Sequence, residues 1–329
     1  MAKKEIPVNT PTLKPALALL AVVAGLAGLG TPARAQFLVD DPFDMLSSTW
    51  TLQRGSASIA DGWIRLQGNG YPRDAFVVTG VGGPWTDYRL VTRFHSDGGG
   101  DNWYNALINF RMKEFFGWSD GTWYGFYLYP PNSAIDPSGG FFLVKKTAAG
   151  YSHLAADYYD PSSLAIGDNL VDIEVRGGDI QLRLNGQIAA SYRDNDPIPD
   201  GGVGLGAIWE SVTRYDFAKV IEPYALEPSS ETQVPRKAGA AFPVRFRIVD
   251  AGGANRSAST TPITVVGLRN AAGDLVSAKA PGGGPATCAY ADGAYRCILG
   301  TGGLAPGEWG LEVRVNGDPR TAVVPFTLR

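Results

Sequence analysis

The sequence predicts an all-β protein that contains two antiparallel sandwiches. Short runs of Val, Ile, Leu, Phe and Tyr recur along the chain, and Gly, Asp, Asn and Pro separate them. Gly occurs 42 times and Pro 23 times in 329 residues, which fits short strands joined by tight turns. Almost no segment has the apolar spacing of a helix, so the strand pattern decides the fold class.

The first 35 residues predict a secretory signal peptide. A lysine-containing start precedes an apolar run at residues 15–30, and Ala33 and Ala35 form an A-x-A cleavage site. A membrane anchor is the alternative, but the run is shorter than the roughly 20 residues that a span needs. We therefore expect cleavage before Gln36, an extracellular or periplasmic protein, and no membrane attachment afterwards.

Residues 36–222 predict the first sandwich. Its strand-like segments alternate or run apolar over four to eight residues, as expected for antiparallel strands. Gly177-Gly178 and Asn185-Gly186 predict hairpin turns between them. The predicted strands include 62–68, 88–96, 104–112, 123–129, 139–146, 169–177, 179–192 and 202–209.

A change of composition separates the two predicted domains. Residues 223–235 contain three Pro and polar filler, so we predict a linker there. Residues 236–329 contain a second set of strand-like segments. About a hundred residues is the size of an immunoglobulin-like β-sandwich, which we predict for this part.

The two cysteines predict a disulfide within one hairpin. Folding the chain about Asp292-Gly293, a strong hairpin turn, places Cys288 directly opposite Cys297. Counting from the turn gives a non-hydrogen-bonded pair, where the Cα atoms lie closest. An exported protein permits the bond, which closes a short loop and contributes about 2.5–3 kcal/mol in the ideal case.

The order of landmarks in residues 37–222 points to a known family. "DDPFD", "WIRLQG", "NALINFR", "YGFYLY", "VDIEVRGG" and "RYDFAKV" follow one another. This order resembles the concanavalin-A-like lectin/glucanase jelly roll, which includes laminin-G-like modules, family-16 glucanases and the 3-keto-disaccharide hydrolase group. The final segment, "LAPGEWGLEVRVNGDPRTAVVPFTLR", resembles the immunoglobulin-like modules of secreted bacterial proteins.

Paired catalytic carboxylates do not occur on the strands where the resemblance would place them. Glycoside hydrolysis needs two carboxyl groups about 5–9.5 Å apart, and glucanases of this fold carry them on one strand. "NALINFR", "YGFYLY" and "FFLVKK" contain no carboxylate. Asp172 and Glu174 share a face, but their segment resembles an ordinary outer strand. The sequence therefore does not support an enzyme.

One face of the predicted sheet combines aromatic, amide and guanidinium groups. Such a face suits sugars, because rings stack on their apolar sides and polar groups bond their hydroxyls. The alternative is that the rings pack under a loop or against the second domain. The predicted ligand-binding residues are Arg93, Asn109, Arg111, Trp123, Tyr127 and Tyr129.

The resemblance also implies a structural calcium site. Glucanases of this fold bind calcium where the N-terminal segment, an early turn and a late strand converge. At the matching positions lie Asp41, Gly62 and Asp216. Calcium accepts carboxylate and backbone carbonyl oxygens, so the set is chemically apt. The alternative is that Asp216 caps a turn or accepts from backbone amides.

We expect a secreted, non-catalytic binding module for carbohydrate or cell-surface glycan. A glycoside hydrolase or lyase of the 3-keto-disaccharide hydrolase-like group is the first alternative, and an adhesive or structural surface protein is the second. With a net charge of −3 and no basic cluster, nucleic acid is not an expected partner.

Overall fold

The computed structural model describes residues 37–45, 47–68, 74–96, 106–117, 120–131, 139–157, 164–208 and 211–329. The predicted signal peptide lies outside these residues and stays a prediction. No helix within these ranges combines the length and the apolar character required to cross a membrane.

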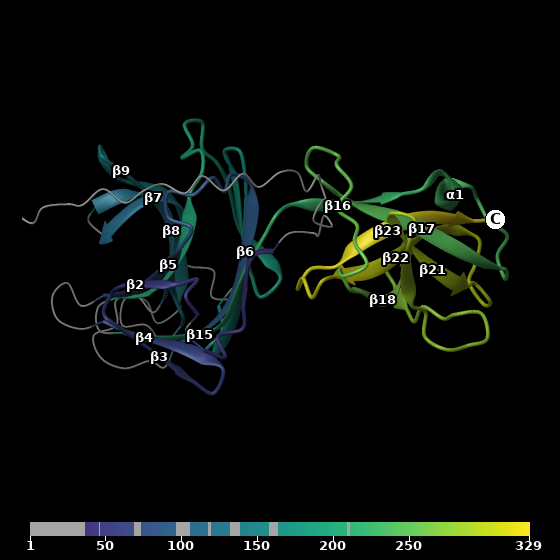
Figure 1. Cartoon of the computed structure of the whole chain (residues 1–329), viewed down its shortest axis with the longest axis horizontal. Helices are drawn as coiled ribbons and strands as arrows, with labels where there is room; N and C mark the ends of the chain where they lie inside the picture. Colours follow the sequence, from purple (N-terminus) through teal and green to yellow (C-terminus); the bar gives the residue numbers. More distant parts are fainter. Residues whose placement is uncertain are drawn as a thin grey trace, which may run out of the picture. The chain divides into compact units, whose positions relative to one another are not determined.

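The first sandwich consists of two antiparallel sheets, which confirms the predicted all-β fold class (Figure 1). One sheet has eight described strands, in the order β13 (Gln187–Arg193), β12 (Asp179–Leu184), β11 (Asp168–Arg176), β6 (Tyr88–Ser96), β15 (Val212–Ile221), β4 (Trp63–Gln67) and β3 (Ser56–Ala60), with β1 (Phe37–Asp41) beside β15. The other has seven described strands, in the order β10 (Gly150–Asp157), β9 (Gly140–Thr147), β8 (Asp120–Tyr129), β7 (Ala106–Gly117), β14 (Gly202–Ala207), β5 (Ala75–Thr79) and β2 (Thr51–Arg54).

The main core lies between these two sheets. Alternate residues of each strand point inward, so β7 contributes Ile108 and Phe110, and β6 contributes Leu90 and Phe94. Both faces of β5 and β14 are buried, because a second hydrophobic cluster covers the outer side of the seven-stranded sheet. This second cluster positions the candidate site.

Two-residue turns join several strands as the sequence predicts. Asn185 has a φ of 52° and Gly186 a φ of 85°, the left-handed conformation that a tight hairpin turn requires. They connect β12 to β13, and Gly177-Gly178 connects β11 to β12. Local turn chemistry therefore sets this part of the eight-stranded sheet.

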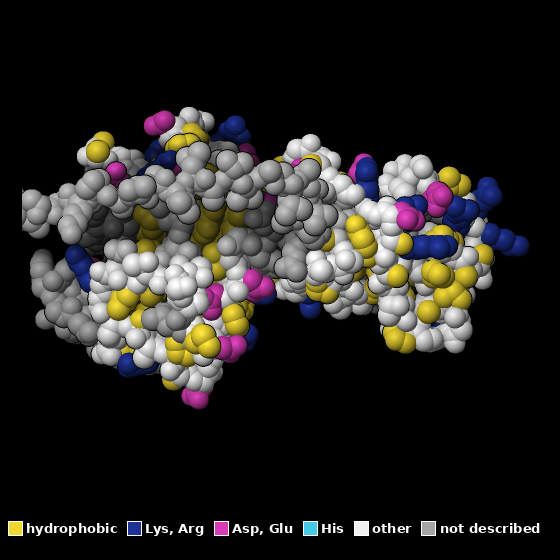
Figure 2. Space-filling model, viewed as in Figure 1, with side chains coloured by type: hydrophobic (Ala, Val, Ile, Leu, Met, Phe, Trp, Pro, Cys, Tyr) yellow, Lys and Arg dark blue, Asp and Glu magenta, His cyan; other side chains and the backbone are white. Residues whose placement is uncertain are grey.

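The second sandwich has two four-stranded antiparallel sheets around a separate core. Figure 2 shows positive, negative and hydrophobic side chains interspersed on its visible surface. Its immunoglobulin-like assignment stays a prediction. The first sheet runs β16 (Tyr224–Pro228), β17 (Ala241–Asp250), β21 (Ala294–Gly300), β20 (Cys288–Ala291), and the second runs β19 (Leu275–Val276), β18 (Ile263–Asn270), β22 (Gly307–Val315), β23 (Ala322–Leu328).

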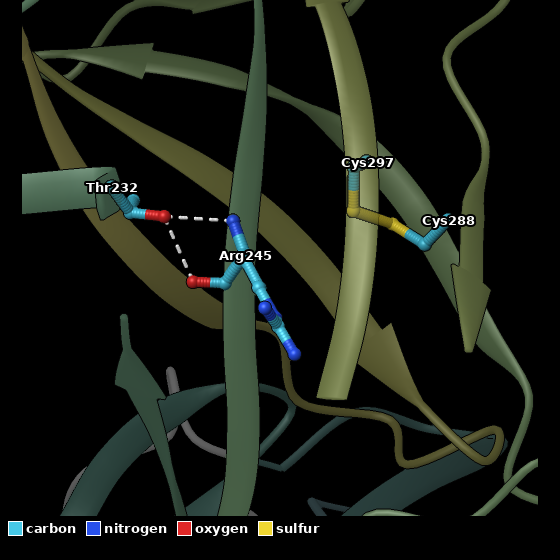
Figure 3. The surroundings of a disulfide bond; sticks show 4 residues. All are labelled: Thr232, Arg245, Cys288 and Cys297. Atoms are coloured by element: carbon cyan, nitrogen blue, oxygen red, sulfur yellow. Dashed lines mark hydrogen bonds between the residues drawn. A yellow bond between two sulfur atoms is a disulfide. The ribbon is translucent and has the colours of Figure 1, made fainter. Parts of the chain in front are cut away.

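The segment predicted as a linker contains regular structure. Within residues 223–235, β16 pairs with β17, and α1 (Ser230–Gln233) follows it. The Thr232 hydroxyl of α1 accepts from the Arg245 backbone N at 2.7 Å and donates to the Arg245 carbonyl at 2.8 Å (Figure 3). Sheets tolerate proline at their edges, and β16 is an edge strand, so its Pro228 is compatible with pairing; the predicted domain boundary stays a prediction.

The structure confirms the predicted disulfide. Cys288 of β20 and Cys297 of β21 are directly paired across the hairpin, and their sulfur atoms are bonded (Figure 3). Their Cα atoms lie 4.1 Å apart. Asp292 and Gly293 both have positive φ, as the predicted turn requires.

Candidate functional site

The aromatic face is the outer side of the seven-stranded sheet, opposite the main core. Alternation along β8 places Tyr124 and Phe126 in the core and Trp123 and Tyr127 on this face, as the sequence predicts. The predicted solvent-reachable surface is wrong, however, because the side chains of this face are at most 5% exposed and pack against one another. The aromatic face comprises Phe76, Leu107, Asn109, Trp123, Tyr127, Tyr129 and Phe142.

Asn109 is the polar residue at the centre of the aromatic face. It is fully buried, and neither its amide nitrogen nor its amide oxygen has a hydrogen-bond partner among the described residues. Buried amides are nearly always paired, because each unpaired group costs about 1–3 kcal/mol. A side-chain amide presents a donor and an acceptor in one plane, which matches two neighbouring hydroxyls of a sugar.

Glycines flank Asn109 on both neighbouring strands. Gly204 of β14 and Gly125 of β8 lie directly opposite it in the two ladders. A Cβ on Gly125 would lie 2.9 Å from the Trp123 ring, so that ring lies against bare backbone. The Phe76 ring and other side chains likewise lie against glycines of β14, where a Cβ would leave no room for them. These glycines place flat rings close around Asn109.

The aromatic face continues to an exposed rim at the sheet edge. Tyr151 of edge strand β10 is 39% exposed and lies edge-on to Trp123, with 5.9 Å between ring centroids. Lys146 Nζ lies 4.8 Å from the centre of the Tyr151 ring. Exposed His153 lies 5.6 Å from the Phe142 ring. Sequence analysis missed this rim, although the alternation of Tyr151 and His153 was the available signal.

Arg111 does not lie on the aromatic face, so its predicted placement is wrong. A bulge in β7 gives Arg111 a φ of 47° and turns its side chain into the end of the sandwich. The guanidinium donates to the carbonyls of Thr86, Gly177 and Ile198 at 2.8, 2.5 and 2.8 Å. Its backbone N donates to the Tyr88 hydroxyl at 2.6 Å. Arg111 therefore ties three loops together.

Arg93 lies on the opposite side of the sandwich from the aromatic face. It belongs to β6 of the eight-stranded sheet, and it points outward as predicted. The predicted grouping with Asn109 and Trp123 is wrong, because the main core separates the two outer faces. Arg93 instead forms an ion pair with Asp216.

The segments of the predicted calcium site converge, but their carboxylates have protein partners. β1 and β4 both pair with β15, so the segments of Asp41, Gly62 and Asp216 meet there. Asp216 is paired with Arg93. Among the described residues, no group of three or more His, Cys, Asp or Glu side chains is arranged to hold a metal ion. Asp41 accepts hydrogen bonds from the Phe43 amide, the Ser47 hydroxyl and the Trp50 indole.

Asp172 and Glu174, the two carboxylates on one face of β11, are held by arginines. Asp172 accepts from Arg89 at 2.9 Å and from Arg320 at 2.8 Å, and Glu174 also pairs with Arg320. Burial works to raise the pKa of Glu174, but the hydrogen bond and charge of Arg320 outweigh it and hold the pKa below its ordinary value. A general acid needs the opposite shift.

Comparison with known proteins gives no family assignment. No protein-family model matches the chain, and no curated protein matches it. The function of this chain is not inferred from the solved structures described next, because their similarity to it is low.

Three solved structures illustrate the similarity. The carbohydrate-binding module CBM66 from Bacillus subtilis has a TM-score of 0.42 and 13% identity, over 53% of this chain and 96% of that one. A Bacillus subtilis protein of unknown function with a galectin-like fold has a TM-score of 0.41 and 14% identity, over 56% of this chain and 95% of that one. The laminarinase catalytic domain from Thermotoga maritima has a TM-score of 0.43 and 11% identity, over 57% of this chain and 98% of that one.

Proposed function

We propose that the first sandwich is a carbohydrate-binding module and that the aromatic face is its binding site. The observation that carries the proposal is the Asn109 amide, which is fully buried among aromatic rings without a hydrogen-bond partner in the described chain. A sugar would place an apolar ring face against the aromatic side chains and two hydroxyls against the amide.

The exposed rim suggests where a glycan would first bind. Tyr151 and His153 are accessible, and ring contacts connect them to the buried Trp123 and Phe142. Asn109 shares a cross-strand row with His153 through Gly125 and Val144. Binding at the centre requires the buried rings to become accessible, so we expect the rim to give the initial contact.

The proposed module is non-catalytic. Strands β5, β9 and β14 contain no Asp or Glu, and the acidic positions of the β7–β8 hairpin, 114 and 120, are paired in the ladder beyond the bulge, away from Asn109. A hydrolase would need two carboxyl groups on either side of a bound sugar. Release of reducing sugar from the glycans that bind would overturn this part of the proposal.

The experiment is a glycan array followed by affinity measurements on the hits. Tyr151→Ala removes an exposed ring and should weaken binding by about tenfold, as expected for the loss of roughly 1.4 kcal/mol of contact. The melting temperature should stay nearly constant, because the ring is partly exposed. Tyr290→Ala, an equally exposed tyrosine of the second sandwich, is the matched control. Equal binding by the two variants would contradict the proposed site.

Export and a structural calcium ion are further parts of the proposal. The apolar start and the A-x-A pattern support export, and the convergence of three segments on β15 supports a metal site. Calcium bound by Asp216 would have to displace Arg93, which makes the calcium prediction directly testable.

A further inference from the structure

The outer face of the eight-stranded sheet carries a cluster of cations around one tryptophan. Alternation along β4, β6 and β15 directs these side chains away from the core, and each is half-buried. We call this cluster the arginine–tryptophan face. It comprises Trp63, Arg65, Arg93, His95, Arg214 and Phe217.

Two arginines lie directly opposite one another on this face, and a histidine lies beside them. Arg214 of β15 is paired with Arg65 of β4 on one side and with His95 of β6 on the other. Directly opposed like charges destabilise a sheet. An anion that binds between the two arginines would offset this repulsion.

Two of the guanidinium groups lie over the ring of Trp63. Arg93 lies 5.9 Å and Arg214 5.6 Å from the centre of the Trp63 ring. Arg93 also lies 5.8 Å from the Phe217 ring. Stacking on aromatic rings restricts the arginine side chains before a ligand arrives, and this preorganisation lowers the entropy lost on binding.

Acidic residues lie beside some cations of this face, but Arg65 has only a neutral partner among the described residues. Asp216 pairs with Arg93, and Asp168 lies 2.6 Å from His95. The Arg65 guanidinium donates to the neutral Gln67 amide at 3.1 Å, and Arg65 forms no ion pair with any carboxylate of the described residues. Arg65 is therefore ready to form a charge-assisted hydrogen bond with an external oxyanion.

We infer that the arginine–tryptophan face binds an acidic polysaccharide through its carboxylate or sulfate groups. Neighbouring strands lie about 4.8 Å apart, so Arg65 and Arg214 are spaced at nearly the rise of one sugar in an extended chain. Nucleic acid fits less well, because the chain has a net charge of −3 and Asp168 and Asp216 lie on the same face. This inference does not rest on the aromatic face.

The test is affinity electrophoresis of the exported protein in gels that contain polygalacturonate, dextran sulfate or neutral dextran. We expect retention by the two acidic polymers, falling as salt is raised, and none by dextran. Stronger retention by polygalacturonate would identify carboxylate as the preferred group, and stronger retention by dextran sulfate would identify sulfate. Equal retention by dextran, or equally strong retention by duplex DNA, would overturn the inference.

Variants test whether the arginine–tryptophan face causes the retention by acidic polymers. The double variant Arg65→Gln and Arg214→Gln should bind acidic polymer at least about tenfold more weakly, as expected for the loss of charge-assisted hydrogen bonds. Arg247→Gln, which removes an exposed, ion-paired arginine from the second sandwich, is the matched control and should bind normally. Unchanged retention in the double variant would refute the site. Asn109→Leu should leave this retention intact, so the two proposals fail independently.

Discussion

Two fully buried asparagines of the first sandwich should respond in opposite ways to the same substitution. Asn109 has no hydrogen-bond partner among the described residues. Asn169 accepts from the Ala165 amide at 2.7 Å and from Asn185 at 3.0 Å, and donates to the carbonyls of Ala165 and Gly167 at 2.9 and 3.1 Å. Leucine has the same number of side-chain heavy atoms as asparagine but no polar group.

The magnitudes follow from these partners. Asn109→Leu removes an unpaired donor and acceptor, each of which costs about 1–3 kcal/mol, and the bulkier leucine offsets part of the gain. We expect a net stabilisation of about 2 kcal/mol, or roughly 4–8 °C in melting temperature. Asn169→Leu breaks four hydrogen bonds worth about 0.5–1.5 kcal/mol each, so it should destabilise the fold by about 2–6 kcal/mol.

Chemical denaturation of both variants measures this difference, and glycan binding completes the test. Asn109→Leu should be more stable than the wild type and should lose affinity for the glycan. Destabilisation by Asn109→Leu would refute the reasoning, because it would show that the amide is satisfied in the folded protein. Stabilisation with unchanged binding would mean that the aromatic face is only packing.

Three further predictions concern residues of the first sandwich. Arg111→Met should destabilise the fold by at least about 3 kcal/mol in urea denaturation, because it removes the donor that the carbonyls of Thr86, Gly177 and Ile198 share. Burial works to raise the pKa of Asp194, but the Tyr124 hydrogen bond and Lys145 outweigh it, so the pKa lies below its ordinary value. Asp194→Asn should therefore destabilise the protein at neutral pH, and denaturation across pH should show the difference vanish as pH falls through the folded-state pKa. Calcium should raise the melting temperature of the wild type but not of Asp216→Asn, and a melting temperature indifferent to chelator would end the calcium prediction.

The sequence predicted those features that depend on neighbouring residues. The Cys288–Cys297 pairing followed from the turn at Asp292-Gly293, four residues from the far end of the hairpin. The inward and outward residues of β8 followed from a period of two. Both predictions needed only the chain within one hairpin.

The site could not be predicted in the same way, because its geometry depends on distant segments. Asn109 is flanked by Gly204, which is nearly a hundred positions away in the sequence. The placement of Arg111 depends on a bulge with a positive φ at a non-glycine residue, for which the sequence contains no signal. Arg93 was grouped with Asn109 because alternation identifies outward residues but not the sheet to which a strand belongs.

The strongest candidates for functional residues are those that break a general rule of folding. Arg111 and Asp172 resembled site residues in the sequence, yet each has a full set of partners and stabilises the fold. Among the described residues, the Asn109 amide has no hydrogen-bond partner, and the like-charged Arg65 and Arg214 lie directly opposite each other. Natural sequences tend to keep local conflicts where a ligand resolves them. Because the two conflicts lie on opposite sheets with the main core between them, their effects on stability should add, and each ligand should bind without the other.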